Sequence, residues 1–201
     1  MPDVKHFDPD AVLDRAVRLF WRRGAAATGV AAVVAETGIS RSSLYATFGG
    51  KQDLYVAALR RYVDRQSRPA FERLAADGRG LPGIAAFFDG LVAARCSGEY
   101  ARWGCMVSNA HAAQGGGGAG EREVLDAHHE ALCAALRTAL LAAREQGHLR
   151  AGVDVRSAAQ MLALLAYGVN LRSRAGAGPG ELADTVGTAL SCLSSTSQTP
   201  R

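Results

Sequence analysis

Apolar side chains recur at intervals of three and four residues along most of this 201-residue chain. That spacing is the period of an α-helix, because residues so spaced fall on one face. The first stripe, residues 12–20, is closed by Gly24 and predicts the first helix. No segment of useful length alternates apolar and polar residues, so we expect no β-sheet. The pattern predicts an all-α protein of about nine helices.

Glycines, prolines and capping residues divide the rest of the pattern into helices. A helix that begins near Lys51 is expected to end or bend before Pro69, because proline removes an N–H group from the helix. The four glycines at 115–118 predict a surface loop. The other predicted helices cover approximately residues 30–37, 41–48, 81–96, 104–113, 121–146 and 155–174, and a last helix follows Gly180.

The inward faces of the later helices follow from the same spacing. In the helix over 81–96, the spacing predicts that Ile84, Phe87, Phe88 and Leu91 point inward. In the helix over 121–146, the predicted inward face is Leu125, His129, Leu132, Leu136 and Leu140, and the seam of the last helix is Leu182, Val186, Leu190 and Leu193.

The segment 28–48 predicts two short helices joined by a tight turn. Gly38 stands where the first of them must stop, because a left-handed residue costs glycine nothing. Ser40 is placed to cap the second helix. Leu44 and Phe48 lie four residues apart and point inward, which leaves small polar and basic side chains outside. This is the pattern of a helix-turn-helix, whose second helix enters the DNA major groove.

Arg41 is the candidate for a base-edge contact, because a guanidinium can make two hydrogen bonds to guanine. Ser42 and Ser43 can reach bases or phosphates, and the other hydroxyl and amino groups are expected to meet phosphate oxygens. For Thr28, capping of the first short helix is an equal alternative. The predicted DNA-contacting residues are Thr28, Arg41, Ser42, Ser43, Tyr45, Thr47 and Lys51.

The net charge of +4 lies entirely in the N-terminal third. Residues 1–68 hold eleven Lys/Arg and seven Asp/Glu, whereas residues 69–201 hold twelve of each. This placement fits a module that faces phosphates. The chain has no secretion signal and no apolar run long enough to cross a bilayer, so we expect a cytoplasmic protein without a membrane partner. Its four dispersed cysteines, Cys96, Cys105, Cys133 and Cys192, favour a reduced compartment.

An ordered set of residues over 7–64 is similar to the N-terminal domain of TetR/AcrR-type repressors. The resemblance is carried by Leu19-Phe20-Trp21-Arg22-Arg23-Gly24, by Thr28 and by the run from Thr37 to Leu54, which includes Leu44-Tyr45-Ala46-Thr47-Phe48-Gly49-Gly50-Lys51. Three positions depart from the family pattern: Ala25 stands where an aromatic residue is usual, and Gly29 and Gly50 replace common hydroxyl residues.

The resemblance implies a helix-turn-helix domain, residues 1–50, followed by a helical ligand-binding and dimerisation domain, residues 51–201. It implies a homodimer through the last two predicted helices, which agrees with their broad apolar faces. It also implies a repressor that leaves a palindromic operator in double-stranded DNA when a small-molecule effector binds. No cofactor, metal or catalytic residue is expected.

The effector site is also implied by resemblance, because Gly104-Cys105-Met106-Val107-Ser108-Asn109 is similar to a signature of one branch of the family. Apolar walls with a few polar groups are usual in ligand pockets. The predicted lining residues are Phe87, Phe88, Trp103, Cys105, Met106, Asn109 and Tyr167.

Alternatives remain open at this point. Cys105 could act as a thiol sensor of oxidants or electrophiles, if Arg95 or Arg102 lowers its pKa. An interaction protein with a basic head is a second alternative. A helical enzyme is a third, although the chain lacks the H-E-x-x-H, G-x-S-x-G and P-loop motifs. Neighbouring His128 and His129 point about 100° apart on a helix, so we expect a structural or surface role rather than a metal site.

Overall fold

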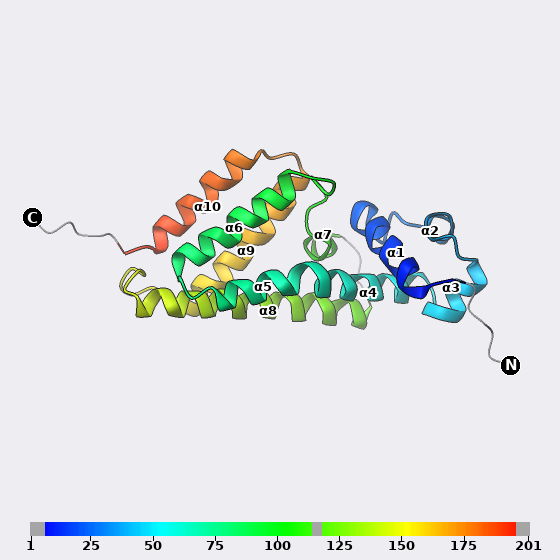
Figure 1. The fold of residues 1–201 in the computed structure, drawn as a ribbon, viewed down its shortest axis with the longest axis horizontal. Coiled ribbons are helices and arrows are strands. Elements are labelled where there is room, and N and C mark those ends of the chain that lie inside the picture. The colour runs from blue at the N-terminus through cyan, green and yellow to red at the C-terminus, as the bar shows by residue number, and fades with distance from the viewer. Residues whose placement is uncertain (1–6, 114–117, 196–201) are drawn as a thin grey trace, which may run out of the picture. The chain divides into compact units, whose positions relative to one another are not determined.

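The computed structural model describes residues 7–113 and 118–195, and the predicted loop over the four glycines lies largely outside this part. Among the described residues all regular secondary structure is helical, and the sole β feature is an isolated bridge between Leu149 and Ser194. No described helix combines the length and the apolar character needed to cross a bilayer. The elements are α1 (Pro9–Arg23), α2 (Val30–Thr37), α3 (Arg41–Phe48), α4 (Lys51–Tyr62), a π-helical segment (Val63–Ser67), α5 (Arg68–Ala76), α6 (Leu81–Cys96), α7 (Met106–Ala112), α8 (Ala119–Glu145), α9 (Val155–Arg174) and α10 (Pro179–Leu193), as labelled in Figure 1.

The all-α fold is thereby confirmed. The chain forms two compact units, the first comprising Met1–Gln66 with Met106–Asp126 and the second Ser67–Cys105 with Ala127–Arg201. These units are defined by which segments of the chain pack together. The boundary expected between residues 50 and 51 instead divides the chain by function, into a DNA-binding part and a ligand-binding part, and it stays a prediction.

In the first unit, α1 packs against α4. The side chain of Asp8 accepts the N–H of Asp10 at 2.9 Å and caps α1. Phe20 meets Tyr55 edge-on with ring centroids 5.1 Å apart, and the rings of Trp21 and Tyr62 are 4.9 Å apart. Edge-to-face pairs of this kind add to the free energy gained by burial. Helix α4 is therefore held firmly beside α1.

The long helix that begins at Lys51 is interrupted before Pro69, as predicted. Its last α-helical residue is Tyr62, and the π-helical segment follows before α5 begins at Arg68. Proline in the first turn of α5 needs no N–H donor there, but within an uninterrupted α-helix its ring would clash with the preceding turn. The wider π turn accommodates the change.

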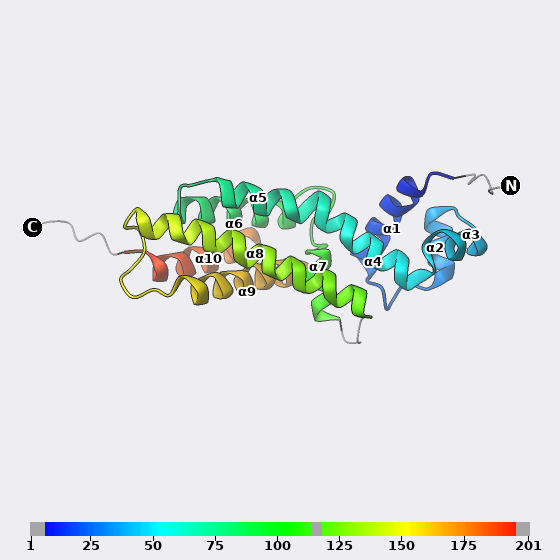
Figure 2. The ribbon, with the colours of Figure 1, turned by 90° about the horizontal axis from the view of Figure 1, so that it is seen from below.

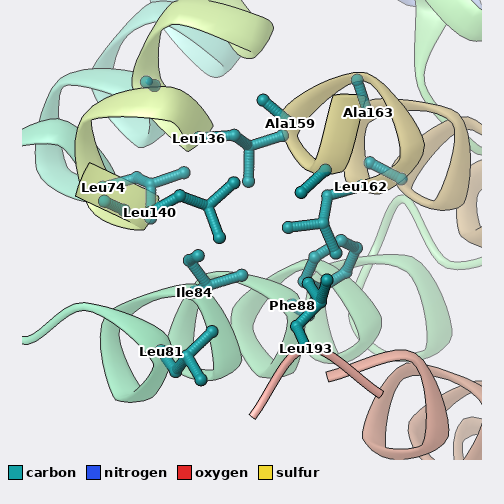
Figure 3. Packing of buried hydrophobic residues seen from close by; sticks show 14 of the residues in the cluster. Leu74, Leu81, Ile84, Phe88, Leu136, Leu140, Ala159, Leu162, Ala163 and Leu193 are labelled. Carbon is teal, nitrogen blue, oxygen red and sulfur yellow. The ribbon is translucent and has the colours of Figure 1, made fainter. Parts of the chain in front are cut away.

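The second unit is built around one apolar core (Figure 3). Ile84 and Phe88 of α6, Leu136 and Leu140 of α8 and Leu162 of α9 have no exposed side-chain surface. Burial of each such side chain contributes about 1.5–3 kcal/mol. Helix α10 packs on α6 and α9, and Figures 1 and 2 show these three helices side by side.

Two inward faces differ in part from the prediction. Phe87 and Leu91 are only half-buried, and Val92 is buried in their place. On α8 the buried histidine is His128, whereas His129 is half-buried. Adjacent helix positions differ by about 100°, so the period alone does not settle which of two neighbours meets the core.

Candidate nucleic-acid interface

The helix-turn-helix is formed by local interactions that the sequence predicted. Gly38 adopts the left-handed conformation (φ 75°, ψ 7°), and its N–H donates to the carbonyl of Val34. Ile39 is buried at the corner. The Ser40 side chain then accepts the N–H of Ser43 at 3.0 Å and caps α3. The turn and the start of α3 are both fixed by hydrogen bonds.

Side chains from α1 and α2 hold this turn in place. Arg15 Nη1 donates to the carbonyl of Thr37 at 2.8 Å. The Thr37 hydroxyl donates to the carbonyl of Val33 at 2.6 Å within the buried side of α2. Leu44 anchors α3 from within, with no exposed surface. The inner face of α3 is packed, so the opposite face is the one available to a partner.

The outer face of α3 carries the predicted DNA contacts. Arg41, Ser42 and Tyr45 are exposed, Tyr45 to 52%. Ser43 and Thr47 are half-buried. Arg41 makes no ion pair with any residue in the described part of the chain. A guanidinium in this position keeps its donors for an external acceptor.

Three other arginines of the first unit, Arg60, Arg61 and Arg65, are already paired. Arg61 Nε donates to Asp14 Oδ1 at 2.7 Å, and Arg65 Nη1 donates to the same oxygen at 2.8 Å. The hydrogen bond from Arg61 is the main reason why the pKa of Asp14 lies below its usual range. Arg60 pairs with Glu123 at 3.0 Å. Positive charge on α4 is thus partly neutralised, whereas Arg41 on α3 is not.

Thr28 and Lys51 have partners within the protein. Thr28 is fully buried, and its hydroxyl donates to the carbonyl of Gly24 at 2.6 Å. The expectation that Thr28 caps α2 is wrong, because the N-cap position is Gly29. Lys51 Nζ donates to the carbonyl of Ala25 at 3.0 Å and is half-buried at the start of α4. Two of its three ammonium protons remain for another acceptor.

The residues predicted for an effector site fall in both units. Phe87, Phe88, Trp103, Cys105 and Tyr167 belong to the second unit, and Met106 and Asn109 belong to the first. Phe88 is a core residue, and the ring of Phe87 meets it edge-on with the two ring centroids 5.4 Å apart. The ring of Trp103 packs on Tyr100 at 5.1 Å. The structure thus gives the local contacts of these side chains within each unit, and their grouping into one effector site stays a prediction.

A polar row on α8, missed from the sequence, crosses the second unit. His128 Nε2 lies 3.2 Å from the Ser67 hydroxyl, and the buried Nδ1 of His128 has no hydrogen-bond partner among the described residues. His129 Nδ1 lies 3.1 Å from the Tyr167 hydroxyl. Cys133 Sγ follows at 3.6 Å from His129 Nε2. Burial raises the pKa of the Cys133 thiol, and nearby Arg137 opposes that shift. The histidine pair was the signal, but periodicity placed the wrong member inward.

Cys105 is buried, with 4% of its surface exposed. A thiol sensor has to reach its oxidant or electrophile, and reactive cysteines are usually partly exposed. A role for Cys105 in sensing would therefore require local opening of the segment before α7.

A helix-turn-helix with a packed inner face and a free basic outer face, joined to a helical second unit, defines a class of DNA-binding transcriptional regulators. The sequence models named "Bacterial regulatory proteins, tetR family" and "Tetracyclin repressor-like, C-terminal domain" match residues 12–58 and 80–187. The chain belongs to the TetR family of transcriptional regulators.

Individual relatives agree with this assignment. The HTH-type transcriptional repressor ComR of Escherichia coli is 28% identical over 186 residues, covering 92% of this chain and 89% of ComR. The HTH-type regulator YezE of Bacillus subtilis, described as uncharacterized, is 29% identical over 94% of this chain and 97% of its own. A cysteine mutant of the regulator CifR, solved with a 26-bp operator duplex, superposes with a TM-score of 0.82 at 28% identity, over 94% of this chain and 98% of CifR. Reduced NemR of Escherichia coli, 21% identical with a TM-score of 0.77 over 93% and 97%, shares the fold.

Proposed function

We propose that this protein is a homodimeric repressor that binds a two-fold-related operator through α3 and leaves it when a small molecule binds the second unit. The observation that carries the proposal is the division of α3 into a buried face at Leu44 and an exposed face at Arg41, Ser42 and Tyr45. The relative ComR, which is named a repressor, and the CifR complex with operator DNA support it. A regulator works where the DNA is, so we place it in the cytoplasm. The proposal assigns it no catalytic reaction.

In this proposal Arg41 reads a base edge, and Ser42, Ser43, Tyr45, Thr47 and Lys51 contact bases or phosphates. Thr28 is left out, because both its hydroxyl and its N–H already donate to carbonyls of the loop before α2. A bidentate arginine contact to guanine contributes about 1–3 kcal/mol of discrimination against the wrong base. Phosphate contacts contribute affinity without sequence preference.

Dimerisation is supported by exposed apolar side chains on α9. Met161, Leu164 and Leu171 are exposed to 42%, 65% and 37%. Their spacing of three and seven residues places them on one helical stripe. A second copy of the chain that covers this stripe would bring two helix-turn-helix motifs into one dimer. The two linked motifs would bind DNA more tightly, because each raises the effective concentration of the other at the operator. Light scattering should give twice the chain mass, and Leu164→Glu should give the mass of one chain. A wild-type monomer at micromolar concentration would contradict the dimer.

The effector part of the proposal rests on the second unit, where Tyr167, His129 and Cys133 form a half-buried polar row next to aromatic side chains. Pockets lined by apolar residues with a few polar groups are the usual sites for small molecules. Phe87, Phe88, Trp103 and Tyr167 stay the predicted apolar contacts. Screening for compounds that raise the melting temperature and release bound DNA, repeated with Tyr167→Phe, tests this part.

Selection of bound duplexes from a random pool is the decisive test of the DNA part. A two-fold-symmetric consensus is expected for the wild type, and Arg41→Ala should relax one base pair in each half-site and weaken binding by about 1–3 kcal/mol. Arg18→Ala is the matched control, because Arg18 is an exposed arginine on α1 that makes no ion pair with the described residues. A wild-type pool without consensus would reject specific recognition.

A further inference from the structure

The first unit contains a hollow of about 370 Å³, which is lined by Met106 and Asn109 of the predicted effector set but by none of the predicted effector residues of the second unit. Cavities of about 300–1,000 Å³ commonly hold small ligands. Helices α1, α4, α7 and α8 and the loop after α1 contribute to its walls. Phe20, Tyr55, Met106 and Ala110 supply buried apolar surface. The hollow therefore offers room and an apolar lining within the unit that carries α3.

The small side chain of Ala25 is one reason why this space is open. Ala25 lines the hollow and is half-buried, directly after Gly24 at the end of α1. A methyl group leaves unfilled the volume that a larger side chain at this position would take. The hollow is thus closed most directly by enlarging residue 25, which supplies a test of any role that the hollow has.

Two opposite charges line the apolar space. Lys51 and Glu121 both line it and are half-buried, and neither forms an ion pair with any described residue. Lys51 Nζ is held by the carbonyl of Ala25 at 3.0 Å, and Glu121 Oε2 accepts from Gln52 Nε2 at 3.1 Å. Each charge keeps hydrogen-bonding capacity, because an ammonium donates three bonds and a carboxylate accepts about four. A half-buried charge gains most from a partner of opposite sign.

We propose that the hollow binds a small amphoteric molecule, such as an apolar amino acid. Its carboxylate is bound by Lys51, its ammonium by Glu121, and its apolar body by the side chains of Phe20, Tyr55 and Met106. A purely anionic molecule would pair with Lys51 but be repelled by Glu121, and a purely cationic molecule would pair with Glu121 but be repelled by Lys51. The pair of charges therefore selects for molecules that carry both.

Binding at this site would regulate DNA affinity through Lys51, and this step rests on the proposed function. Lys51 is a proposed phosphate contact, and a ligand carboxylate competes for the same ammonium. Coupling between two binding sites is reciprocal, so the ligand should weaken DNA binding by the factor by which DNA weakens ligand binding. Binding of the ligand to the hollow does not require DNA, so it can be measured on the protein alone.

Equilibrium dialysis of the full-length protein with three labelled probes tests the proposal. L-phenylalanine, 2-phenylethylamine and 3-phenylpropanoate share one apolar body and differ in their charged groups. L-phenylalanine should bind at least about tenfold more tightly than either of the others. Lys51→Met should abolish its advantage over 2-phenylethylamine, and Glu121→Gln its advantage over 3-phenylpropanoate.

The cavity-filling variant Ala25→Phe should remove binding of L-phenylalanine, whereas Ala131→Phe, at an exposed position on α8, should retain it. Circular dichroism and melting curves establish that each variant is folded. Equal binding of all three probes, no binding of L-phenylalanine, or full binding to folded Ala25→Phe would overturn the site. If L-phenylalanine binds as expected but DNA selection gives no consensus, the site stands and the proposed function fails.

Discussion

Arg15 Nη1 donates to the backbone carbonyl of Thr37 at 2.8 Å, across 22 positions of sequence. Thr37 is the last residue of α2, where carbonyl groups have no partner within the helix. A guanidinium at this end also interacts favourably with the helix dipole. The bond therefore ties α1 to the turn at Gly38 and, through that turn, sets the start of α3.

Arg15→Leu is expected to lower the stability of the first unit by about 1–2 kcal/mol, because a charge-assisted hydrogen bond is lost. Urea unfolding followed by the fluorescence of Trp21 measures this, in a Trp103→Phe background so that one tryptophan remains. Arg18→Leu, exposed on the same helix, should change stability little. Equal effects of the two variants would mean that the bond to Thr37 contributes nothing specific.

Among the four thiols, Cys105 should react least. In the single chain Cys192 is exposed, Cys96 and Cys133 are half-buried and Cys105 is buried. Burial raises the pKa of the Cys133 thiol, which lowers its thiolate fraction at neutral pH. Brief iodoacetamide treatment followed by peptide mass spectrometry should therefore show least labelling at Cys105.

The thiol-sensor alternative makes the opposite prediction. If mild peroxide modifies Cys105 first, and Cys105→Ser no longer releases DNA under peroxide, the sensor hypothesis is correct. The segment that buries Cys105 must then open readily. Release of DNA by peroxide from Cys105→Ser would reject it. DNA binding by unmodified protein serves as the reference in both cases.

The parts of the fold that were predictable from the sequence are those determined within a few residues. The turn at Gly38, the cap at Ser40 and the interruption before Pro69 depend on local backbone requirements, which single residue types reveal. The long-range contacts that hold the first unit together were not predictable. Nothing near Arg15 or Lys51 indicates a carbonyl more than twenty positions away, because such pairs depend on tertiary packing.

The candidate effector residues show the same limit. A short signature predicted Met106 and Asn109 as effector-site residues beside Phe87 and Tyr167; Met106 and Asn109 belong to one unit and Phe87 and Tyr167 to the other, so their grouping stays a prediction. Helical periodicity also could not predict which of His128 and His129 is buried, because this depends on which neighbouring helices pack against α8. The class of protein was predictable from the resemblance, whereas the local environment of each side chain depends on tertiary packing.

Gly78 and Gly80 allow the effect of a substitution in open space to be compared with that of one at a close approach. Both have positive φ, +71° and +70°. A Cβ on Gly80 would lie 2.7 Å from the Cα of Ala143 on α8, whereas a Cβ on Gly78 meets nothing within 4 Å. Gly78→Ala should cost about 1–2 kcal/mol from backbone conformation alone. Gly80→Ala should cost clearly more, about 3 kcal/mol or above, because the backbone of α8 cannot yield cheaply.

Thermal and urea unfolding of the second unit, followed by the fluorescence of Trp103 in a Trp21→Phe background, measure the difference. Gly90→Ala, in the interior of α6 with open space around its Cα, should raise stability by about 0.5–1 kcal/mol and is the control. Equal losses in Gly78→Ala and Gly80→Ala would show that the close approach to Ala143 carries no energetic weight.

The pair of Asp14 with Arg61 and Arg65 should make the first unit sensitive to acid. Hydrogen bonding from Arg61, the largest cause, lowers the folded-state pKa of Asp14 below its unfolded value of about 3.9. The pair thus stabilises the protein fully above that value, and this contribution is lost as the pH falls through the folded-state pKa. Since 34% of the Asp14 side chain is exposed, solvent screening limits the contribution to about 1 kcal/mol.

Asp14→Asn should therefore lower the unfolding free energy by about that amount between pH 5 and pH 8, and the difference from the wild type should shrink towards zero between about pH 4 and pH 2. Urea titrations at each pH, with Trp21 as the reporter, measure it. Asp126→Asn, an exposed position on α8 without an ion pair to the described residues, should show no such trend. A loss of stability in Asp14→Asn that stays constant down to pH 2 would show that the variant perturbs packing rather than removing a titrating charge, because only the charge is cancelled by protonation.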